Sequence, residues 1–291
     1  MFSGSIPALV TPFCDGAFSE KHFRALIDWQ IEQGSNALVP AGTTGEASTL
    51  SNAEHHRVIE VCIEQAAGRV PVIAGCGSND TNNAILHLNF SKKSGAAAGL
   101  VVAPYYNRPN QEGIYAHFEH MTKKNDLPIL LYNVPARTVT DIKPETVARL
   151  AKLPTVIGIK DASGDMPRVT EHRLACGPDF CLLSGVDEQS LAFNAAGGKG
   201  CISVTANVAP KLCAEFQAAC ASGDYDLARA LNDKLYPLHL ALFSDASPGP
   251  IKYALSRVIK GFPTELRLPM TPPSEASCRQ VDAALENAGL I

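Results

Sequence analysis

TVIGIKDA, residues 155–162, is a short apolar run that ends on a lysine. Its near-continuous β-branched and aliphatic residues are typical of a strand buried on both faces of a parallel sheet. A lysine directly after such a strand is unexpected, because burial of an ammonium group is costly. The run therefore predicts a buried parallel strand and raises the question of what Lys160 does at its end.

Seven further runs of this kind precede residue 209, and amphipathic stretches of helical length separate them. Strands that alternate with helices predict parallel βαβ units. Eight such units favour an α/β fold of the (β/α)8 TIM-barrel type over an open doubly wound sheet. The other seven runs are SIPALVTPF (5–13), NALVPAG (36–42), VPVIAGCG (70–77), GLVVAPYY (99–106), PILLYNVP (128–135), FCLLSGVD (180–187) and GCISVTANV (200–208).

Two of the intervening stretches carry clear helix boundaries. The first begins at Ser19, a predicted N-cap, and stops at Gly34. The second has the capping-box spacing from Ser51 to Glu54 and stops at Gly68. Both are predicted as amphipathic helices on the outside of the barrel.

The pattern changes after Val208, because helical stretches follow one another without a strand between them. We expect a C-terminal helical extension packed on the barrel, with a Pro-rich connector at 266–274. The predicted division is a catalytic barrel domain over 1–222 and a helical domain over 223–291. The predicted helices lie near 209–222, 224–244, 248–260 and 274–288.

The composition is that of an ordinary globular protein: 291 residues, 46% hydrophobic, 19% charged and a formal net charge of -4. The scattered basic residues give no electrostatic signature for nucleic acid or an anionic membrane. No apolar run reaches the roughly 18 residues of a membrane span, and the N-terminus lacks the basic region of a signal peptide. We therefore expect a cytoplasmic protein that binds neither nucleic acid nor membrane.

The nine cysteines show no CxxC spacing, and several lie inside apolar segments. Reduced, buried side chains are favoured over a disulfide framework or a zinc site. No metal is expected.

Chemistry in a TIM barrel takes place at the C-terminal ends of the strands. Several polar residues end the predicted strands, where the apolar pattern alone would not place them. The candidates are Thr11, Thr43, Thr44, Tyr105, Tyr106, Tyr132, Arg137, Lys160, Gly185 and Ile202.

For Lys160 there are two interpretations. Its stem could lie on the barrel rim with the ammonium in solvent. Alternatively it could form a Schiff base with a ketone, since a desolvated lysine loses its proton more readily and the neutral amine is the nucleophile. The apolar strand and the catalytic end of the barrel favour the second interpretation.

Such a reaction needs a proton shuttle and an anchor for a carboxylate. Tyr132 is a candidate shuttle, or else a core tyrosine with a satisfied hydroxyl. The turn AGTTGEAS (41–48) offers hydroxyls and free amides that suit a small anion. Arg137 could clamp a carboxylate, with a surface salt bridge as the alternative.

Five motifs, in order and at matching spacing, resemble the dihydrodipicolinate synthase family over the stretch from Ser5 to Leu290. The motifs are GTTGE (42–46), PYYNRPNQEG (104–113), YNVPART (132–138), GIKDASG (158–164) and GCISVTAN (200–207). The resemblance implies a Schiff-base lyase of (β/α)8 fold in the diaminopimelate and lysine pathway. Pyruvate would condense with aspartate semialdehyde, and no metal or organic cofactor is implied.

The resemblance also implies roles for individual residues. Lys160 would form the imine, and Tyr132, Thr43 and Tyr106 would make up a hydroxyl relay, with Tyr106 lent across a subunit interface. A homo-oligomer, a dimer of dimers, is therefore implied. The residues implied in substrate binding are Thr44 for the pyruvate carboxylate, Arg137 for that of the semialdehyde, and Gly185 and the Ile202 carbonyl at the pocket wall.

Two alternatives remain open at this stage. One is another pyruvate-dependent aldolase of the same superfamily, such as a 2-keto-3-deoxy sugar-acid aldolase or N-acetylneuraminate lyase. The other is a non-catalytic barrel that binds a keto acid. The intact relay residues and the arginine of YNVPART favour the synthase.

Lysine-inhibited members of the family carry a regulatory site, and this chain retains Tyr105, His55 and Asn79 at the matching places. It has Asn83 in place of a glutamate and Asn52 in place of a histidine. Loss of an acidic partner for an ammonium predicts weak or absent lysine feedback.

Three other features carry weaker expectations. DASPGPIK (245–252) departs from the family pattern and could line the mouth of the pocket. The pair His55 and His56 is expected to be structural, because adjacent helical residues face different directions. GGKG (197–200) is expected to be a helix-to-strand corner.

Overall fold

A computed structural model describes all 291 residues of the chain. Seven parallel strands are hydrogen-bonded in the order β1-β9-β8-β7-β6-β5-β4. Isolated parallel bridges, Ala8 to Val39 and Leu38 to Val72, fill the place between β1 and β4. The eight strand positions thus close into a ring, and the predicted (β/α)8 barrel is confirmed. The strands are β1 (Gly4–Pro7), β4 (Ile73–Gly75), β5 (Ala98–Val102), β6 (Ile129–Asn133), β7 (Val156–Asp161), β8 (Cys181–Ser184) and β9 (Gly200–Ser203).

The second predicted strand, 36–42, is reduced to the two bridges. Pro40 has no N–H to donate, and Ala41 has a left-handed φ of 53°, which ends the extended conformation. The chain also passes very close to its neighbour here: a Cβ on Gly75 would lie 2.1 Å from the Ala41 carbonyl oxygen. Only glycine at position 75 allows this approach.

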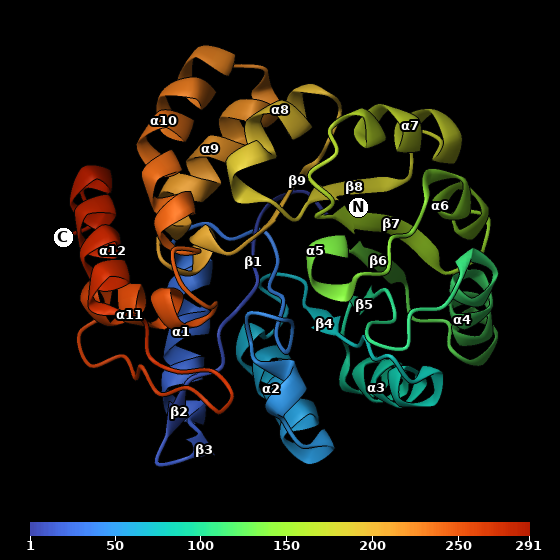
Figure 1. Cartoon of the computed structure of the whole chain (residues 1–291), viewed down its shortest axis with the longest axis horizontal. Coiled ribbons are helices and arrows are strands. Elements are labelled where there is room, and N and C mark those ends of the chain that lie inside the picture. The colour runs from blue at the N-terminus through green and yellow to red at the C-terminus, as the bar shows by residue number, and fades with distance from the viewer.

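Helices surround the strands, and α10 to α12 lie together on one side of the barrel with the C-terminus at the outer edge (Figure 1). None of these helices combines the length and the apolar composition of a membrane-spanning segment. The α-helices are α1 (Glu20–Glu32), α2 (Asn52–Ala66), α3 (Thr81–Ser94), α4 (Gln111–Lys124), α5 (Pro135–Thr138), α6 (Pro144–Leu150), α7 (Pro167–Cys176), α8 (Ser190–Ala195), α9 (Pro210–Ser222), α10 (Tyr225–Ala241), α11 (Gly249–Val258) and α12 (Glu275–Ala288). Short 3-10 turns are η1 (Ala47–Thr49), η2 (Asp187–Gln189) and η3 (Thr205–Asn207).

The predicted capping box of α2 is confirmed. The Glu54 amide donates to the Ser51 hydroxyl at 3.3 Å, and the Ser51 amide donates to the Glu54 carboxylate at 3.0 Å. Ser19 does stand at the N-cap of α1, but its side chain makes no capping bond. Its hydroxyl pairs instead with Nδ1 of His22 at 2.7 Å. The predicted N-cap position of Ser19 is therefore confirmed, although its side chain does not cap the helix.

The first predicted strand is shorter than its apolar run. β1 ends at Pro7, and Phe13 at the end of the run belongs to a small antiparallel hairpin, β2 (Phe13–Cys14) with β3 (Ala17–Phe18). Asp15 and Gly16 form its turn, with φ of 52° and 77°. Asp-Gly is a common sequence for such turns. The pair Asp15-Gly16 therefore indicated a hairpin, which was missed because residues 5–13 were read as one strand.

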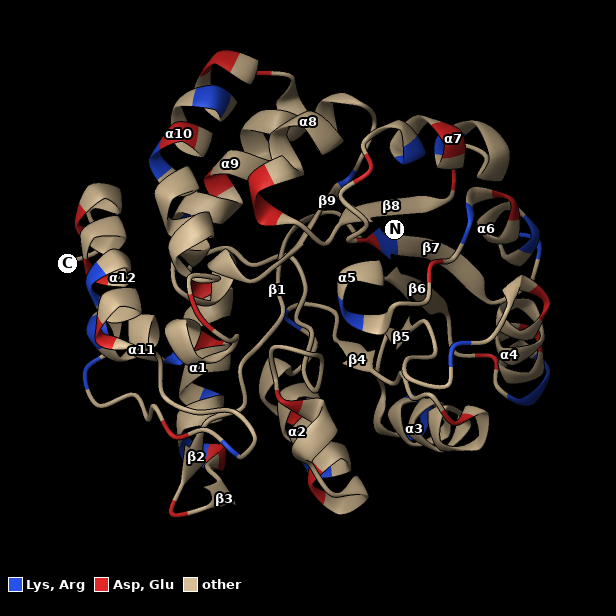
Figure 2. Cartoon of the chain, in the orientation of Figure 1, with Lys and Arg blue, Asp and Glu red and all other residues tan.

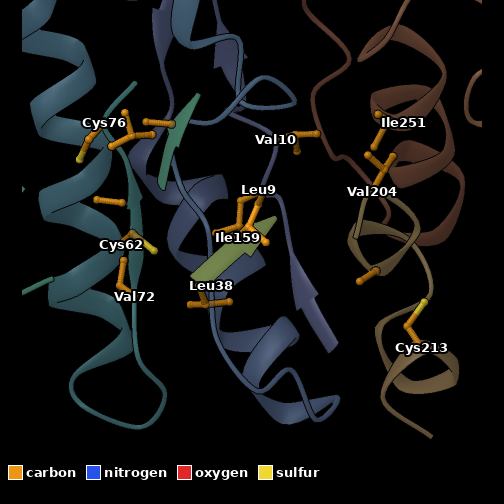
Figure 3. Packing of buried hydrophobic residues seen from close by; sticks show 14 of the residues in the cluster. Leu9, Val10, Leu38, Cys62, Val72, Cys76, Ile159, Val204, Cys213 and Ile251 are labelled. Carbon is orange, nitrogen blue, oxygen red and sulfur yellow. The ribbon is translucent and has the colours of Figure 1, made fainter. Parts of the chain in front are cut away.

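Buried apolar residues form two clusters, one of 54 and one of 13 residues. Alternate strand residues separate them: Leu130 and Tyr132 of β6 belong to the smaller cluster, whereas Leu131 belongs to the larger one. This alternation places the smaller cluster inside the barrel and the larger one between the strands and the helices. Ile159 belongs to the outer cluster (Figure 3), so the adjacent Lys160 faces the barrel interior.

All nine cysteines are free thiols. Figure 3 shows Cys62, Cys76 and Cys213 within the larger cluster. Burial raises the pKa of the Cys76 thiol to about 12, so it behaves as a small apolar side chain. The sequence-based interpretation of the cysteines as free, buried side chains holds for these three.

The C-terminal helices begin close to their predicted positions. α10 packs against α9 and α12, and α12 also packs against α11. Gly223, with a φ of 80°, separates α9 from α10. We propose that the domain boundary falls here, between residues 222 and 223. The segment 245–252, expected at the mouth of the pocket, is not among the residues that line it.

Gly158 tests how tightly β7 is held in the barrel. A Cβ at this position would lie 2.3 Å from the Cys181 carbonyl oxygen of β8. We expect Gly158→Ala to push the two strands apart and lower the free energy of unfolding by about 1–3 kcal/mol or more. Urea denaturation measures this loss. Leu174→Ala, at a side chain that is 74% exposed, is the control and should change stability by less than about 0.5 kcal/mol. Equal losses in the free energy of unfolding for the two substitutions would contradict the close packing of β7 against β8.

Candidate active site

A cavity of about 460 Å³ opens where the strands end. Its wall includes Thr43 and Thr44 after the second strand position, Tyr132 of β6, Arg137 of α5 and Lys160 of β7. Five of the predicted site residues, taken from three different barrel strands and the loops after them, are therefore brought together. This is the end of the barrel at which the strand pattern predicted the chemistry.

The side chain of Lys160 faces the interior of the barrel. It is in register with Tyr132 of β6 and Leu183 of β8, and only 6% of it is exposed. Its Nζ lies 4.2 Å from the centroid of the Tyr132 ring. No carboxylate or hydrogen-bond acceptor of the chain pairs with the amine, which leaves it exposed to the cavity that it lines.

Gly185, directly after β8, packs closely against the side chain of Lys160. A Cβ at this position would lie 2.9 Å from Cε of Lys160 and 2.8 Å from Cβ of Ala162. Gly185 is held by its amide, which donates to the Asp161 carbonyl at 2.7 Å. The missing side chain thus leaves room for the stem of Lys160, although Gly185 does not itself line the cavity.

Tyr132 is 7% exposed and lines the cavity. Its hydroxyl has no hydrogen-bond partner within the chain, which argues against a purely structural tyrosine whose hydroxyl is satisfied in the core. Its ring contacts the amine and its hydroxyl is free, so the residue is placed to exchange protons with a group bound on Lys160.

The turn at 42–46 is suited to hold an anion. The amide of Gly45 donates to the Gly42 carbonyl and that of Glu46 to the Thr43 carbonyl, both at 3.1 Å, and the Thr11 hydroxyl donates to the Gly45 carbonyl at 2.7 Å. These bonds shape the turn and leave the amides and hydroxyls of Thr43 and Thr44 without partners. Unpaired donors in a rigid turn can bind a small carboxylate. Thr11, a strand-end candidate, buttresses this turn.

Arg137 stands on the one-turn helix α5, exposed at the cavity wall and without an acidic partner. The surface salt bridge considered from the sequence is therefore not formed. A free guanidinium at the rim can take a carboxylate in bidentate geometry.

Besides Gly185, two more of the predicted catalytic and substrate-binding residues do not line the cavity of their own chain. Tyr106 is 90% exposed and has a φ of 69°, and Ile202 is buried in the interior cluster. No hydrogen bond joins Thr43 to Tyr132 or to Tyr106. One chain alone therefore does not assemble the hydroxyl relay.

Histidines form a second part of the cavity wall, next to Tyr105. Nε2 of His55 lies 2.7 Å from the Gly75 carbonyl, and its ring stacks on His87 with centroids 4.0 Å apart. His87 in turn lies 3.2 Å from His56 and 3.2 Å from the Asn83 amide. Asn79, expected beside them, does not line the cavity.

His87 was missed by the sequence reasoning. Its signal was the four-residue spacing from Asn83, which places both side chains on one face of α3. His55 and His56 face different directions, as predicted, yet both contact His87. No group of three or more histidine, cysteine or acidic side chains in the chain could hold a metal ion.

Burial lowers the pKa of His55 to about 4 and that of His87 to about 3, and neighbouring imidazoles add to both shifts. Burial likewise lowers the pKa of His117 to about 4. Each imidazole is neutral in the folded chain at a pH where the unfolded chain, with a histidine pKa of about 6.5, would protonate it.

The unfolded chain therefore binds more protons between about pH 6.5 and pH 4, and the free energy of unfolding should fall as the pH is lowered through this range. Each buried histidine adds up to about 1.4 kcal/mol per pH unit. Urea denaturation at several pH values measures the slope. His87→Gln should reduce the number of protons taken up on unfolding by about one and lower the slope accordingly. The exposed control His120→Gln should leave the slope unchanged. A slope unaffected by His87→Gln would contradict this account.

Comparison with known proteins identifies the family. The model of the Dihydrodipicolinate synthetase family matches residues 1–288. The 4-hydroxy-tetrahydrodipicolinate synthase of Novosphingobium aromaticivorans is 72% identical over 293 residues, covering 100% of this chain and 99% of that one.

Solved structures agree. The chloride-inhibited dihydrodipicolinate synthase of Acinetobacter baumannii, complexed with pyruvate, is 44% identical with a TM-score of 0.97, and each chain is covered over 100%. The enzyme of Cyanidioschyzon merolae with lysine bound is 36% identical with a TM-score of 0.96, covering 100% of this chain and 99% of that one. From its full-length match, its barrel fold and its relatives, the chain belongs to the Dihydrodipicolinate synthetase family.

Proposed function

We propose that this lyase condenses pyruvate with L-aspartate-4-semialdehyde through an imine on Lys160, the 4-hydroxy-tetrahydrodipicolinate synthase reaction. The observation that carries the proposal is the buried, unpaired amine of Lys160, which contacts the Tyr132 ring and lines the same cavity as the free donors of Thr43 and Thr44. The names of its relatives favour this reaction over that of a sugar-acid aldolase or N-acetylneuraminate lyase.

The steps follow from the placement of these groups. The Lys160 amine attacks the keto carbon of pyruvate, and loss of water gives the imine, while the 43–44 turn holds the carboxylate. The imine withdraws electrons, so a proton leaves the methyl carbon and an enamine forms. That carbon then bonds to the aldehyde carbon of the semialdehyde, whose oxygen takes a proton. Attack by the substrate's own amine at the imine carbon closes the ring and releases Lys160.

The proton transfers are assigned to Tyr132, and Arg137 is assigned to the carboxylate of the semialdehyde. In the proposal, Gly185 and the Ile202 carbonyl complete the wall behind the imine. No organic cofactor and no metal take part in these steps.

A second copy of the chain would complete the relay. Tyr106 is a large aromatic residue that projects into solvent, 90% exposed, in a left-handed conformation that is costly for a residue with a Cβ. We propose that it enters the site of a neighbouring subunit and joins Thr43 and Tyr132. A dimer is then the smallest complete catalyst, and a dimer of dimers is the expected assembly. A cytoplasmic location remains a prediction.

The first test is trapping with borohydride in the presence of pyruvate. We expect the chain to gain the mass of one pyruvate less one water plus two hydrogens, on the peptide that contains Lys160. Lys160→Met should abolish the adduct and lower turnover by about a thousandfold or more, while the exposed control Lys152→Met should retain both.

The choice of aldehyde is tested on the same protein. Pyruvate should be consumed with aspartate semialdehyde and not with polyhydroxylated aldehydes. An adduct without condensation of the semialdehyde would support a sugar-acid aldolase, and no adduct on the folded protein would support a keto-acid binding barrel.

Lysine feedback is expected to be weak. The polar wall made by Asn52, His55, Asn83 and Tyr105 contains no carboxylate that could pair with the ammonium of a bound lysine. A charge-assisted hydrogen bond contributes about 1.5–3 kcal/mol, or roughly ten- to a hundredfold in affinity. We therefore expect half-maximal inhibition by lysine only above about 1 mM.

Asn83→Glu should increase sensitivity to lysine by roughly tenfold or more in an inhibition assay. Asn82→Glu is the matched control, because it adds the same charge on the same helix at an exposed position outside the cavity. Tight inhibition of the unmodified enzyme, or equal effects of the two substitutions, would contradict this interpretation.

A further inference from the structure

Glu46 closes the turn that carries Thr43 and Thr44, yet its side chain points away from the cavity. Its backbone has a φ of 56°, and its side chain is 2% exposed. Both carboxylate oxygens are taken by residues more than 200 positions later in the chain. Oε1 accepts from Nζ of Lys252 at 2.5 Å, and Oε2 accepts from the Arg267 amide at 3.1 Å.

Lys252 has no contact with solvent. Its side chain is 0% exposed on α11, and besides Glu46 it donates to the Glu265 carbonyl at 2.7 Å and lies 4.4 Å from the centroid of the Phe13 ring. Burial lowers the pKa of Lys252, and the Glu46 carboxylate opposes this shift. An ammonium held in the interior with a single carboxylate is a costly arrangement that demands well-defined geometry.

Arg267 strengthens the same connection. Its guanidinium donates to the Thr49 carbonyl at 3.2 Å, pairs with the Glu54 carboxylate and lies 4.2 Å from the centroid of the Phe13 ring. The connector and the helix α11 thus hold the segment after the turn at three successive points, Glu46, Thr49 and Glu54. These contacts cross from the C-terminal helical part of the chain to the barrel.

We propose that Lys252 and Glu46 are a positioning pair, through which the C-terminal helices hold Thr43 and Thr44 in the geometry that binds the substrate carboxylate. Neither residue lines the cavity, so both act through the turn rather than on the substrate. The inference rests on the proposed function, in which this turn takes the carboxylate of pyruvate. According to this inference, the C-terminal helices support the pyruvate site from outside the cavity.

The test compares three variants: Lys252→Met, Glu46→Gln, and the two combined. The single substitution Lys252→Met leaves a buried carboxylate unpaired and should destabilise the fold, whereas the double variant removes both charges and keeps an acceptor for the Arg267 amide. We expect the double variant to recover most of the thermal stability while its pyruvate KM stays raised by about ten- to a hundredfold. The rate of imine trapping at saturating pyruvate should change less than the KM.

Arg257→Met is the matched control. It lies on the same helix, and the change breaks the Arg257–Asp282 pair without touching the turn, so its pyruvate KM should equal that of the unmodified protein.

The outcomes are separable. A double variant with restored stability and an unchanged pyruvate KM would show that the pair is merely structural and would overturn the inference alone. An unmodified protein that forms no pyruvate adduct would overturn the proposed function and this inference together.

Discussion

The register between β6 and β7 is the constraint on which the site depends. It pairs Tyr132 with Lys160 and Asn133 with Asp161, so both residues of the first pair face the barrel interior and both residues of the second pair face the helices. A slip by one residue would turn Lys160 out of the barrel and bring Ile159 in. The site is therefore a direct consequence of strand pairing, and the close approach of Gly158 to β8 helps to hold that pairing.

Charged side chains have different surroundings on the surface and in the interior of the molecule. On the outer helices, acidic and basic residues are mixed along the solvent side (Figure 2), where most ion pairs are exposed and contribute little. Inside, Lys160 is left without a counter-ion, while Lys252 is paired with Glu46. In the proposed function the first lysine takes part in covalent chemistry, whereas the second joins the C-terminal helices to the turn beside the cavity.

Much of this could be predicted from the chain. The runs that alternate with helical stretches predicted the barrel, and the residues at their ends predicted Lys160, Tyr132, Arg137 and the 43–44 turn as neighbours. The boundaries were less predictable: residues 36–42 form only two bridges because of Pro40 and Ala41. His87 and Lys252 were missed, since His87 contacts His55 and His56 of another helix and Lys252 pairs with Glu46, 206 positions earlier.

The sequence by itself determined the fold class and the family, and it singled out Lys160 as the proposed reacting lysine, because local periodicity and residue type at strand ends are properties of short segments. Only the tertiary structure decided that Glu46 pairs with Lys252, that Gly185 makes room for Lys160, and that Tyr106 stays outside its own cavity. The physical reason is that burial and partnership depend on side-chain contacts between different segments of the chain, which the periodicity within one segment does not encode.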